Sequence, residues 1–428
     1  MFLERVKIEN IRSLRSVEID MTDSETDKSV RKWTLLVGEN GTGKSTILKC
    51  IGLILGGSEA LPHILGNPSQ WVRHGEQQGK ISATLRTSDW EERKLEFVIN
   101  ADDNVRTIYS NNLAGLELLD EALEHASQNY FTVAYGPFRR VSSESGVMNS
   151  SSSVQGLSPR AESLITLFDK DAQVHPLQSW AMDLDYQRGE EGIEIVRESM
   201  NKLMPDVEFV GIEKKQKTLI FNTPDGHVPL EHLSDGYQNV AAWIGDLLYR
   251  VTEAFAHYKK PLEARGLLLI DEVDAHLHPA WQRRLRQFLS NTLPNFQIVA
   301  TTHSALTLQQ AHHGDATVLS RNQDNFVEAN QFPTDPSKLR LHQIYDLAFK
   351  IDSLDSWEIE QSKNEYRKLS AKEKDGLSDN ERIQLEQATR TLEILPDHGP
   401  DGLGNEAMQD FLSELKNATA EIAKMAKE

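Results

Sequence analysis

Cysteine is almost absent from this sequence. Its 428 residues include a single cysteine, Cys50. One thiol excludes a disulfide within the chain and every zinc site built from several cysteines, zinc hooks included. A chain that uses no disulfides suits a reducing compartment, so we expect a cytoplasmic protein.

Long hydrophobic runs are absent as well. No window of the sequence approaches the roughly 20 consecutive apolar residues that a membrane-spanning helix needs. The opening MFLERVKIEN carries charges within its first five residues and has no apolar run of the length found in signal peptides. We therefore expect no membrane role.

Positive charge is also scarce. The chain has 46 Lys and Arg against 65 Asp and Glu, a formal net charge of −19. A protein that coats nucleic acid by itself needs a basic face, and this balance argues against one. Small basic clusters do occur at Arg139–Arg140, Lys214–Lys217 and Arg283–Arg286. Contact with DNA is therefore expected only indirectly, through a partner, or through such a local patch.

A glycine loop is the most informative feature that is present. The stretch LLVGENGTGKSTILKC, residues 35–50, runs from apolar residues through glycines into helix-favouring residues, which predicts strand, loop and helix. It matches G-x-x-x-x-G-K-[ST], in which backbone N–H groups close on phosphates. Lys44 would reach the β- and γ-phosphates of ATP, and the Ser45 hydroxyl would hold Mg²⁺. The nucleotide-binding residues predicted in the loop are Gly38, Asn40, Gly41, Gly43, Lys44, Ser45 and Thr46.

A second apolar run, GLLLIDEVDAHLHP at residues 266–279, ends in two carboxylates. Such a run predicts a strand buried on both faces. Asp271 stands where a strand-terminal carboxylate joins the Mg²⁺ shell, and Glu272, one residue further on, could polarise an attacking water. On its own this pattern is common at strand ends. Together with the glycine loop it indicates a nucleotide site.

A third apolar run, FQIVATTHS at residues 296–304, ends in His303. A lone histidine is usually structural. This strand, however, is expected beside the Asp271 strand in a parallel sheet, which would bring His303 to the edge where such sheets bind ligands. We assign His303 to sensing the γ-phosphate and the attacking water.

The segment LSDGYQN, residues 233–239, opens a helical pattern, and taken alone it reads as a capped helix start. The order of the motifs, however, resembles that of the ABC-type ATPase head. In that family the corresponding residues, here Ser234 and Gly236, face the γ-phosphate held by a second subunit. The resemblance therefore implies a homodimer closed around ATP, with assembly into a higher oligomer.

The N-terminal stretch VKIENIRSLRSVEI indicates which class of ABC-type head this chain resembles. It is similar to the first strand and turn of the RecF and SMC class. That class places residues equivalent to Asn10 and Arg12 near the nucleotide. It implies an α/β fold: an ABC-ATPase head with a mixed sheet, a helical lid insertion and a helical C-terminal region. The stretch between Lys44 and Ser234 is too short for a long coiled-coil arm and has no sustained heptads.

The closest family resemblance is to the ATPases of bacterial anti-phage systems related to the OLD family, including those of Septu systems and some retrons. The motifs that support this resemblance are WVRHGE, AYGPFRR, LSDGYQN, IDEVDAHLHPAWQ and TTHS. The resemblance to the Septu and retron ATPases implies a separate partner nuclease of the HNH type. The family's glutamine switch is not identifiable, and the YGPFRR segment is a candidate replacement. No Toprim-like or HNH-like pattern follows, so we expect the chain not to be the nuclease itself.

Four regions are expected along the chain. They are an N-terminal part of the head at 1–140, a helical lid at 141–225, a C-terminal part of the head at 226–345 and a helical interaction region at 346–428. Alternating residues at 78–110 predict antiparallel strands. The tail predicts two charged helices, the second capped by Ser378, and a final helix over 405–426.

Two other functions remain open on the sequence alone. A DNA-repair ATPase like RecF would grip DNA directly and hydrolyse ATP faster on DNA. A scaffold protein would bind ATP and barely turn it over.

Overall fold

The computed structural model describes residues 1–23, 29–87, 90–126, 130–141, 156–204, 207–351, 355–371 and 378–393. The chain divides into two units, Met1–Lys350 and Ile351–Glu428. The final helix expected over 405–426 lies outside the described residues. Among the described helices none is both long and apolar enough to cross a membrane.

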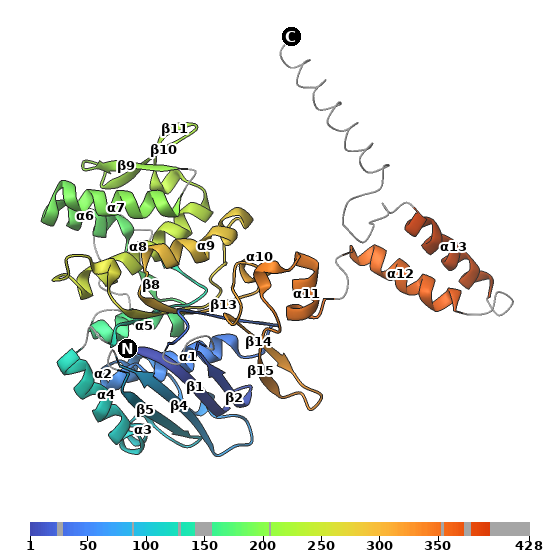
Figure 1. Cartoon of the computed structure of the whole chain (residues 1–428), viewed down its shortest axis with the longest axis horizontal. Helices are drawn as coiled ribbons and strands as arrows, with labels where there is room; N and C mark the ends of the chain where they lie inside the picture. Colours follow the sequence, from blue (N-terminus) through green and yellow to red (C-terminus); the bar gives the residue numbers. More distant parts are fainter. Residues whose placement is uncertain are drawn as a thin grey trace, which may run out of the picture. The chain divides into compact units, whose positions relative to one another are not determined.

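The first unit is organised around a six-stranded sheet (Figure 1). The pair of strands at one end of the sheet, 316–321 and 327–331, is antiparallel, and all other neighbouring pairs are parallel. This confirms the expected α/β class with a mixed sheet. In spatial order the strands are β15 (Val327–Gln331), β14 (Ala316–Arg321), β3 (Trp33–Gly38), β13 (Phe296–Thr302), β12 (Gly266–Ile270) and β6 (Thr132–Tyr135).

The strand order brings the three sequence motifs to one edge of this sheet. β13 lies between β3 and β12 and is parallel to both. The strand ending in Thr302 is therefore the direct neighbour of the strand ending in Ile270, as expected from the sequence. Because parallel strands end at the same edge, the glycine loop, Asp271 and His303 all emerge there.

Alternate residues of the central strands pack into two different cores. Leu36 and Leu269 face a core shared with a four-stranded antiparallel sheet and the helix after the glycine loop. Leu35 and Ile270 face the opposite core. The antiparallel sheet has the order β2 (Leu14–Asp20), β1 (Phe2–Ile11), β4 (Gln78–Arg86) and β5 (Glu92–Asn100), and the helices of this part are α1 (Lys44–Ile54), α2 (Gly57–Ile64), α3 (Val105–Asn111) and α4 (Leu113–Ala126).

One strand expectation in this part is wrong. Residues 104–110 alternate like a strand, yet Val105–Asn111 form the helix α3. Asn104 and Thr107 each accept a hydrogen bond from the other's backbone N–H, a reciprocal capping box that favours a helix start over a strand.

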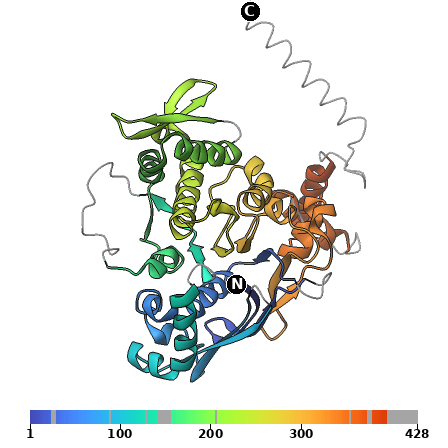
Figure 2. The ribbon, with the colours of Figure 1, turned by 60° about the vertical axis from the view of Figure 1, so that its left-hand side comes forward.

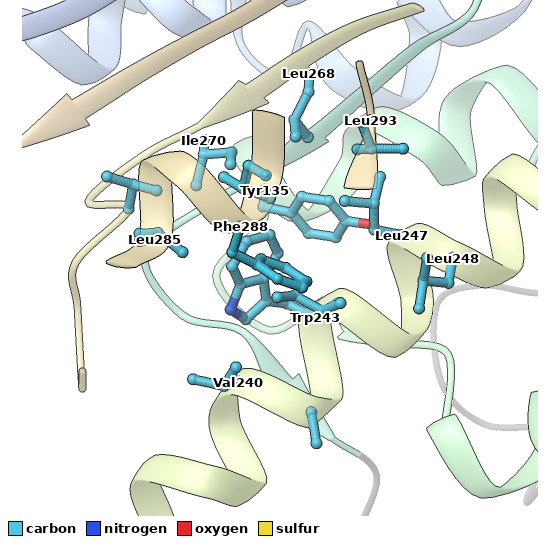
Figure 3. Close-up of a cluster of buried hydrophobic side chains, with 14 of the residues drawn as sticks. Tyr135, Val240, Trp243, Leu247, Leu248, Leu268, Ile270, Leu285, Phe288 and Leu293 are labelled. Carbon is cyan, nitrogen blue, oxygen red and sulfur yellow. The ribbon is translucent and has the colours of Figure 1, made fainter. Parts of the chain in front are cut away.

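The opposite core is built around α8 (Asp235–Ala254) and α9 (Pro279–Thr292). Figure 3 shows side chains from both helices and from β6 and β12 converging there, among them Trp243, Phe288 and Tyr135. Trp243 and Tyr135 are both about 1% exposed. The helix that begins at the Ser234 motif is therefore packed directly on the strands that carry the catalytic candidates.

The expected lid, 141–225, is only partly helical. Its described part holds three helices and then two six-residue strands, which form a three-stranded sheet with a strand at 226–229, because the stretches at 208–223 alternate apolar and polar residues (Figure 2). The elements are α5 (Pro159–Phe168), α6 (Leu177–Arg188), α7 (Glu190–Leu203), β9 (Glu208–Glu213), β10 (Thr218–Thr223) and β11 (Gly226–Pro229). Other described elements of the unit are β7 (Arg140–Val141), β8 (Gln173–Val174), α10 (Ala305–Leu308), α11 (Leu341–Phe349) and the 3-10 helices η1 (Pro68–Gln70), η3 (Leu230–His232), η4 (Pro261–Glu263) and η5 (Pro336–Lys338).

The second unit contains the two charged helices expected in the tail. They are α12 (Trp357–Ser370) and α13 (Asp379–Glu393), and they pack against each other. Ser378 caps α13 as expected, since its hydroxyl accepts a hydrogen bond from the Glu381 N–H at 3.4 Å while its own N–H donates to the Glu381 carboxylate at 2.9 Å.

Candidate nucleotide site

The glycine loop joins β3 to α1 and requires glycine at its first position. Gly38 ends β3 with φ of 144°, and a Cβ there would overlap the backbone oxygen of Leu319 on β14. Gly43 precedes α1 with φ of 91°. These glycines allow the backbone to turn tightly, so that the loop's N–H groups and the start of α1 can meet a phosphate.

The clash at Gly38 yields a stability prediction. Gly38→Ala is expected to cost on the order of 3 kcal/mol of folding free energy, because backbone atoms cannot yield as a side chain does. Gly41→Ala is the matched control in the same loop. Gly41 has φ of 77°, and a Cβ added there would meet nothing within 4 Å, so only backbone strain of about 1 kcal/mol is expected. Thermal denaturation of both variants checks this, and equal losses would contradict it.

Lys44 is a buried cation at the start of α1. Its side chain is 6% exposed, and its ammonium donates hydrogen bonds to the carbonyls of Gly38 and Glu39, both at 2.8 Å. Burial lowers the pKa of Lys44 to about 8, against the opposing effect of Asp271 and other nearby carboxylates. An anion placed beside the ammonium would raise that pKa again, so this position suits a phosphate.

Thr301 contacts both residues that follow β12, Asp271 through its carboxylate and Glu272 through its backbone N–H. Its hydroxyl donates to the Asp271 carboxylate at 2.6 Å and accepts from the Glu272 N–H at 2.7 Å. Glu272 has φ of 49°, a left-handed conformation that is uncommon for a residue other than glycine. Such strain persists only where surrounding contacts hold it, and it is frequent at functional sites. Thr301 was not predicted as a site residue, although its place beside His303 marks the same strand end.

His303 follows β13 at the same edge. Burial lowers the pKa of its imidazole, and the positive charge of Lys44 acts in the same direction. The ring is therefore mainly neutral near pH 7, which leaves one ring nitrogen as donor and the other as acceptor. Both functions are useful to a group that contacts phosphate and water.

A cavity of about 220 Å³ collects these groups. Lys44, Asp271, Glu272 and His303 all line it, so Lys44 and His303, 259 positions apart in the chain (303 − 44), meet at one site. Its full lining is Ser13, Asn40, Gly41, Gly43, Lys44, Ser45, Thr46, Asp271, Glu272 and His303. Ser13 was not predicted from the sequence, and its position directly after Arg12 in the β1–β2 turn is the signal that could have found it.

Asn10 and Arg12 do not line this cavity. The Arg12 guanidinium lies 4.4 Å from the centre of the Trp71 ring, and its Nε donates to the carbonyl of Gln70 at 3.3 Å. Burial lowers the pKa of Arg12. Asn10 and Arg12 both have positive φ, 52° and 48°, so the turn before Ser13 is held in an unusual shape. Their assignment to nucleotide binding stays a prediction.

Ser234 and Gly236 also lie outside the cavity. Ser234 is exposed at the start of α8, and a Cβ on Gly236 would come within 3.5 Å of the His276 carbonyl. Tyr237 packs edge-on against Trp281 of α9, with ring centres 4.4 Å apart. Within one chain this helix start therefore faces the loop that follows Glu272.

Arg139 corrects the expectation of a basic cluster at Arg139–Arg140. It is 7% exposed, and its guanidinium donates to the carbonyls of Asp271 and Glu272, both at 2.7 Å. An arginine buried in this way is not available to a DNA phosphate. In the other two clusters Lys214 pairs with Asp185 at 2.6 Å and Arg286 with Asp315 at 2.7 Å, which leaves less free positive charge than the sequence indicates.

Family models match most of the first unit. One, described as "AAA domain, putative AbiEii toxin, Type IV TA system", matches residues 77–309, more than half of the chain. Another, described as "AAA ATPase domain", matches residues 1–104. Together they cover the glycine loop, both carboxylates and His303.

Two similar proteins are each named Septu protein PtuA. That of Bacillus mycoides is 28% identical over 324 residues, which is 76% of this chain and 41% of that protein. That of Bacillus thuringiensis is 25% identical over 342 residues, which is 78% of this chain and 79% of that protein. This chain thus spans less than half the length of the first relative. The matches confirm the resemblance to Septu ATPases.

Shorter or more distant similarities accompany these. The Retron Vc95 probable ATPase of Vibrio cholerae is 34% identical over 117 residues, 27% of this chain and 22% of that protein. A crystal structure of the SmcHead bound to the C-winged helix domain of ScpA has a TM-score of 0.45 at 16% identity, and the match covers 77% of this chain and 97% of that one.

Proposed function

This chain belongs to the family described as "AAA domain, putative AbiEii toxin, Type IV TA system", and from that premise we propose that it binds ATP with Mg²⁺ and hydrolyses it. The observation that carries the proposal is the cavity in which the ends of β3, β12 and β13 bring Lys44, Asp271, Glu272 and His303 together. A buried ammonium whose hydrogen bonds go to carbonyls is the donor that a triphosphate needs.

Each side chain has a distinct task in this proposal. Lys44 binds the phosphates, and the Ser45 hydroxyl with the Asp271 carboxylate would hold Mg²⁺, which neutralises phosphate charge when bound. Both line the cavity, and hard oxygen donors of this kind fit that ion. Glu272 orients and polarises the attacking water, while His303 contacts the γ-phosphate.

We further propose that two copies close around two ATP molecules. In this arrangement Ser234 and Gly236 of one copy meet the γ-phosphate held by the other. The exposure of Ser234 and its position outside its own chain's cavity support this role, because a group that serves a second copy must be free to reach it. An isologous pair repeats the same contact twice, which gives one dimer two complete sites.

Replacing Ser234 tests the need for a second copy. Ser234→Arg is expected to leave ATP binding within about 2-fold and to lower hydrolysis by about 10-fold or more, because a bulky side chain at the start of α8 keeps that helix start from the γ-phosphate held by the partner copy. Folding should be unaffected, since Ser234 is exposed and its side chain makes no capping hydrogen bond. Ser290→Arg, at an equally exposed serine of α9, is the matched control. Full hydrolysis by Ser234→Arg would count against the two-copy site.

We propose that the ATP state governs a separate partner nuclease of the HNH type, held by a higher oligomer of this chain, and that the chain itself is not the nuclease. Support comes from the similarity to the PtuA proteins of Septu systems. ATP binding would favour one arrangement of the copies and hydrolysis another, which changes access to the partner.

The partner proposal is tested on material purified from cells that express the neighbouring genes together with this chain. A nuclease that copurifies and cuts DNA differently with and without ATP supports it. A chain that arrives alone and hydrolyses ATP faster on DNA, with a steep loss of affinity as salt rises, points instead to a repair ATPase that grips DNA directly.

A further inference from the structure

Arg139 connects the loop after β6 to the turn that carries the catalytic carboxylates. Its Nη2 donates to the carbonyls of both Asp271 and Glu272 at 2.7 Å, and its Nε donates to the carbonyl of Gly136 at 3.2 Å. These bonds hold the backbone of Glu272 in its left-handed conformation, while Thr301 holds the Glu272 N–H from the other side. The direction of the Glu272 side chain therefore depends on Arg139.

The other face of Arg139 rests on α8. The centre of its guanidinium lies 5.0 Å from the centre of the Trp243 ring, a stacking geometry favourable to a cation. Trp243 is 1% exposed and packs against the Tyr135 ring, with ring centres 5.7 Å apart. Arg139 is thus packed between the helix that begins at Ser234 and the turn that holds Glu272.

A second line of contacts joins the same two elements. The hydroxyl of Tyr135 donates to the Asp246 carboxylate at 2.6 Å, and Asp246, fully buried on α8, is also paired with Arg250 at 2.7 Å. The carbonyl of Tyr135 accepts the Asp271 N–H at 2.8 Å. A shift of α8 therefore displaces β6 and the Asp271 backbone as well as Arg139.

We propose that Arg139 is a positioning residue that passes the position of α8 to Glu272, so that contact of a second copy with Ser234 aligns Glu272 for hydrolysis. This inference rests on the proposed ATPase function. It gives the YGPFRR segment the task of linking the two halves of the head. A positioning error of about 1 Å in such a group is enough to lower a rate by about 10²-fold.

The chemistry of arginine suits this task. A planar guanidinium with donors fixed in a fork can satisfy three carbonyls at once, whereas a lysine ammonium is a point charge on a flexible stem. Burial lowers the pKa of Arg139 to about 10, opposed by the charges of Asp271, Asp274 and Glu272, so the group stays protonated at neutral pH. A lysine at position 139 should therefore keep the positive charge and lose the simultaneous hydrogen bonds to the three carbonyls.

The first test compares two arginines that each donate hydrogen bonds to backbone carbonyls. Arg139→Lys is expected to lower kcat about 10- to 100-fold with the ATP dissociation constant changed by less than about 2-fold. Arg160→Lys is the matched control. Arg160 is partly buried and donates to the carbonyls of Leu55 and Tyr130 at 2.7 and 2.6 Å, but these carbonyls do not belong to the Glu272 turn. If both variants lose kcat and thermal stability to the same degree, Arg139 is merely structural and the inference is overturned.

The second test measures coupling. Ser234→Arg should lower kcat by about 10-fold or more in the wild-type protein and in Arg160→Lys. In Arg139→Lys it should lower kcat by much less, because the contacts that link α8 to Glu272 are already broken. Independent, multiplicative effects in the Arg139→Lys background would contradict the inference.

A readout without turnover separates this inference from the proposed function. Hydrogen exchange of the amides of Glu272 and Val273, which bond to Thr301, should slow on ATP binding in wild type and Arg160→Lys but not in Arg139→Lys. Absence of ATP hydrolysis in wild type would count against the proposed function alone, whereas equal slowing in Arg139→Lys would overturn the role of Arg139.

Discussion

Glu272→Gln is expected to lower ATP hydrolysis by about 10³-fold while ATP affinity stays within about 2-fold. Glutamine keeps the shape of the side chain and removes its ability to accept a proton from water. The backbone contacts that set this position, to Thr301 and Arg139, involve the N–H and carbonyl of residue 272 and survive the change. Single-turnover hydrolysis and equilibrium binding of ATP measure the two quantities separately.

The same variant should accumulate the closed pair of copies in the presence of ATP and Mg²⁺, because the step that releases the pair is blocked. Glu39→Gln is the matched control: Glu39 is an exposed residue of the glycine loop whose carbonyl, not its carboxylate, contacts Lys44. Unchanged turnover in Glu272→Gln would remove Glu272 from its assigned role.

Lys44→Ala is expected to weaken ATP binding by about 100-fold or more, because charge-assisted hydrogen bonds to phosphate contribute roughly 1.5–3 kcal/mol each. Lys49→Ala is the control on the same helix: Lys49 is partly buried on α1 but does not line the cavity. Titration of each variant with a fluorescent ATP analogue gives the comparison. Retention of wild-type affinity by Lys44→Ala would contradict the site.

The low pKa of Lys44 adds a stability effect to this prediction. Burial disfavours the ammonium in the nucleotide-free protein, so Lys44→Met, which keeps the volume without the charge, is expected to unfold at the same or a higher temperature than wild type without ATP. With ATP the order should reverse, because a ligand stabilises only the protein that binds it. Thermal unfolding with and without ATP tests the reversal.

The sequence predicts the phosphate-binding edge because its signals are local. The order of apolar residues, glycines and Lys44 specifies strand, loop and helix, and the parallel sheet then brings Asp271 and His303 to the same edge. The segment that forms α3 predicts a strand instead, because its short apolar pattern fits either period, and the reciprocal cap at Asn104 decides the outcome.

The role of Arg139 could not be read from the sequence. Two adjacent arginines look like a surface cluster, and burial is decided by partners far away in the chain. The carbonyls that Arg139 holds lie 132 and 133 residues further on. For Ser234, the structure of one chain is not enough to assign a role. Its exposure in one chain is a structural fact, whereas the surface it would meet belongs to a second copy.

A mixture of two inactive variants tests the central claim most directly. Lys44→Ala has an intact Ser234 and no phosphate-binding lysine, and Ser234→Arg has the reverse defect. A mixed pair contains one chain of each variant. At one of its two sites the Ser234→Arg chain supplies an intact cavity with Lys44, and the Lys44→Ala chain supplies an intact α8 start with Ser234. Equimolar mixing should therefore restore up to about a quarter of the wild-type hydrolysis rate per chain, because half of randomly formed pairs are mixed and each holds one complete site. A mixture no more active than its components would contradict a site completed by a second copy.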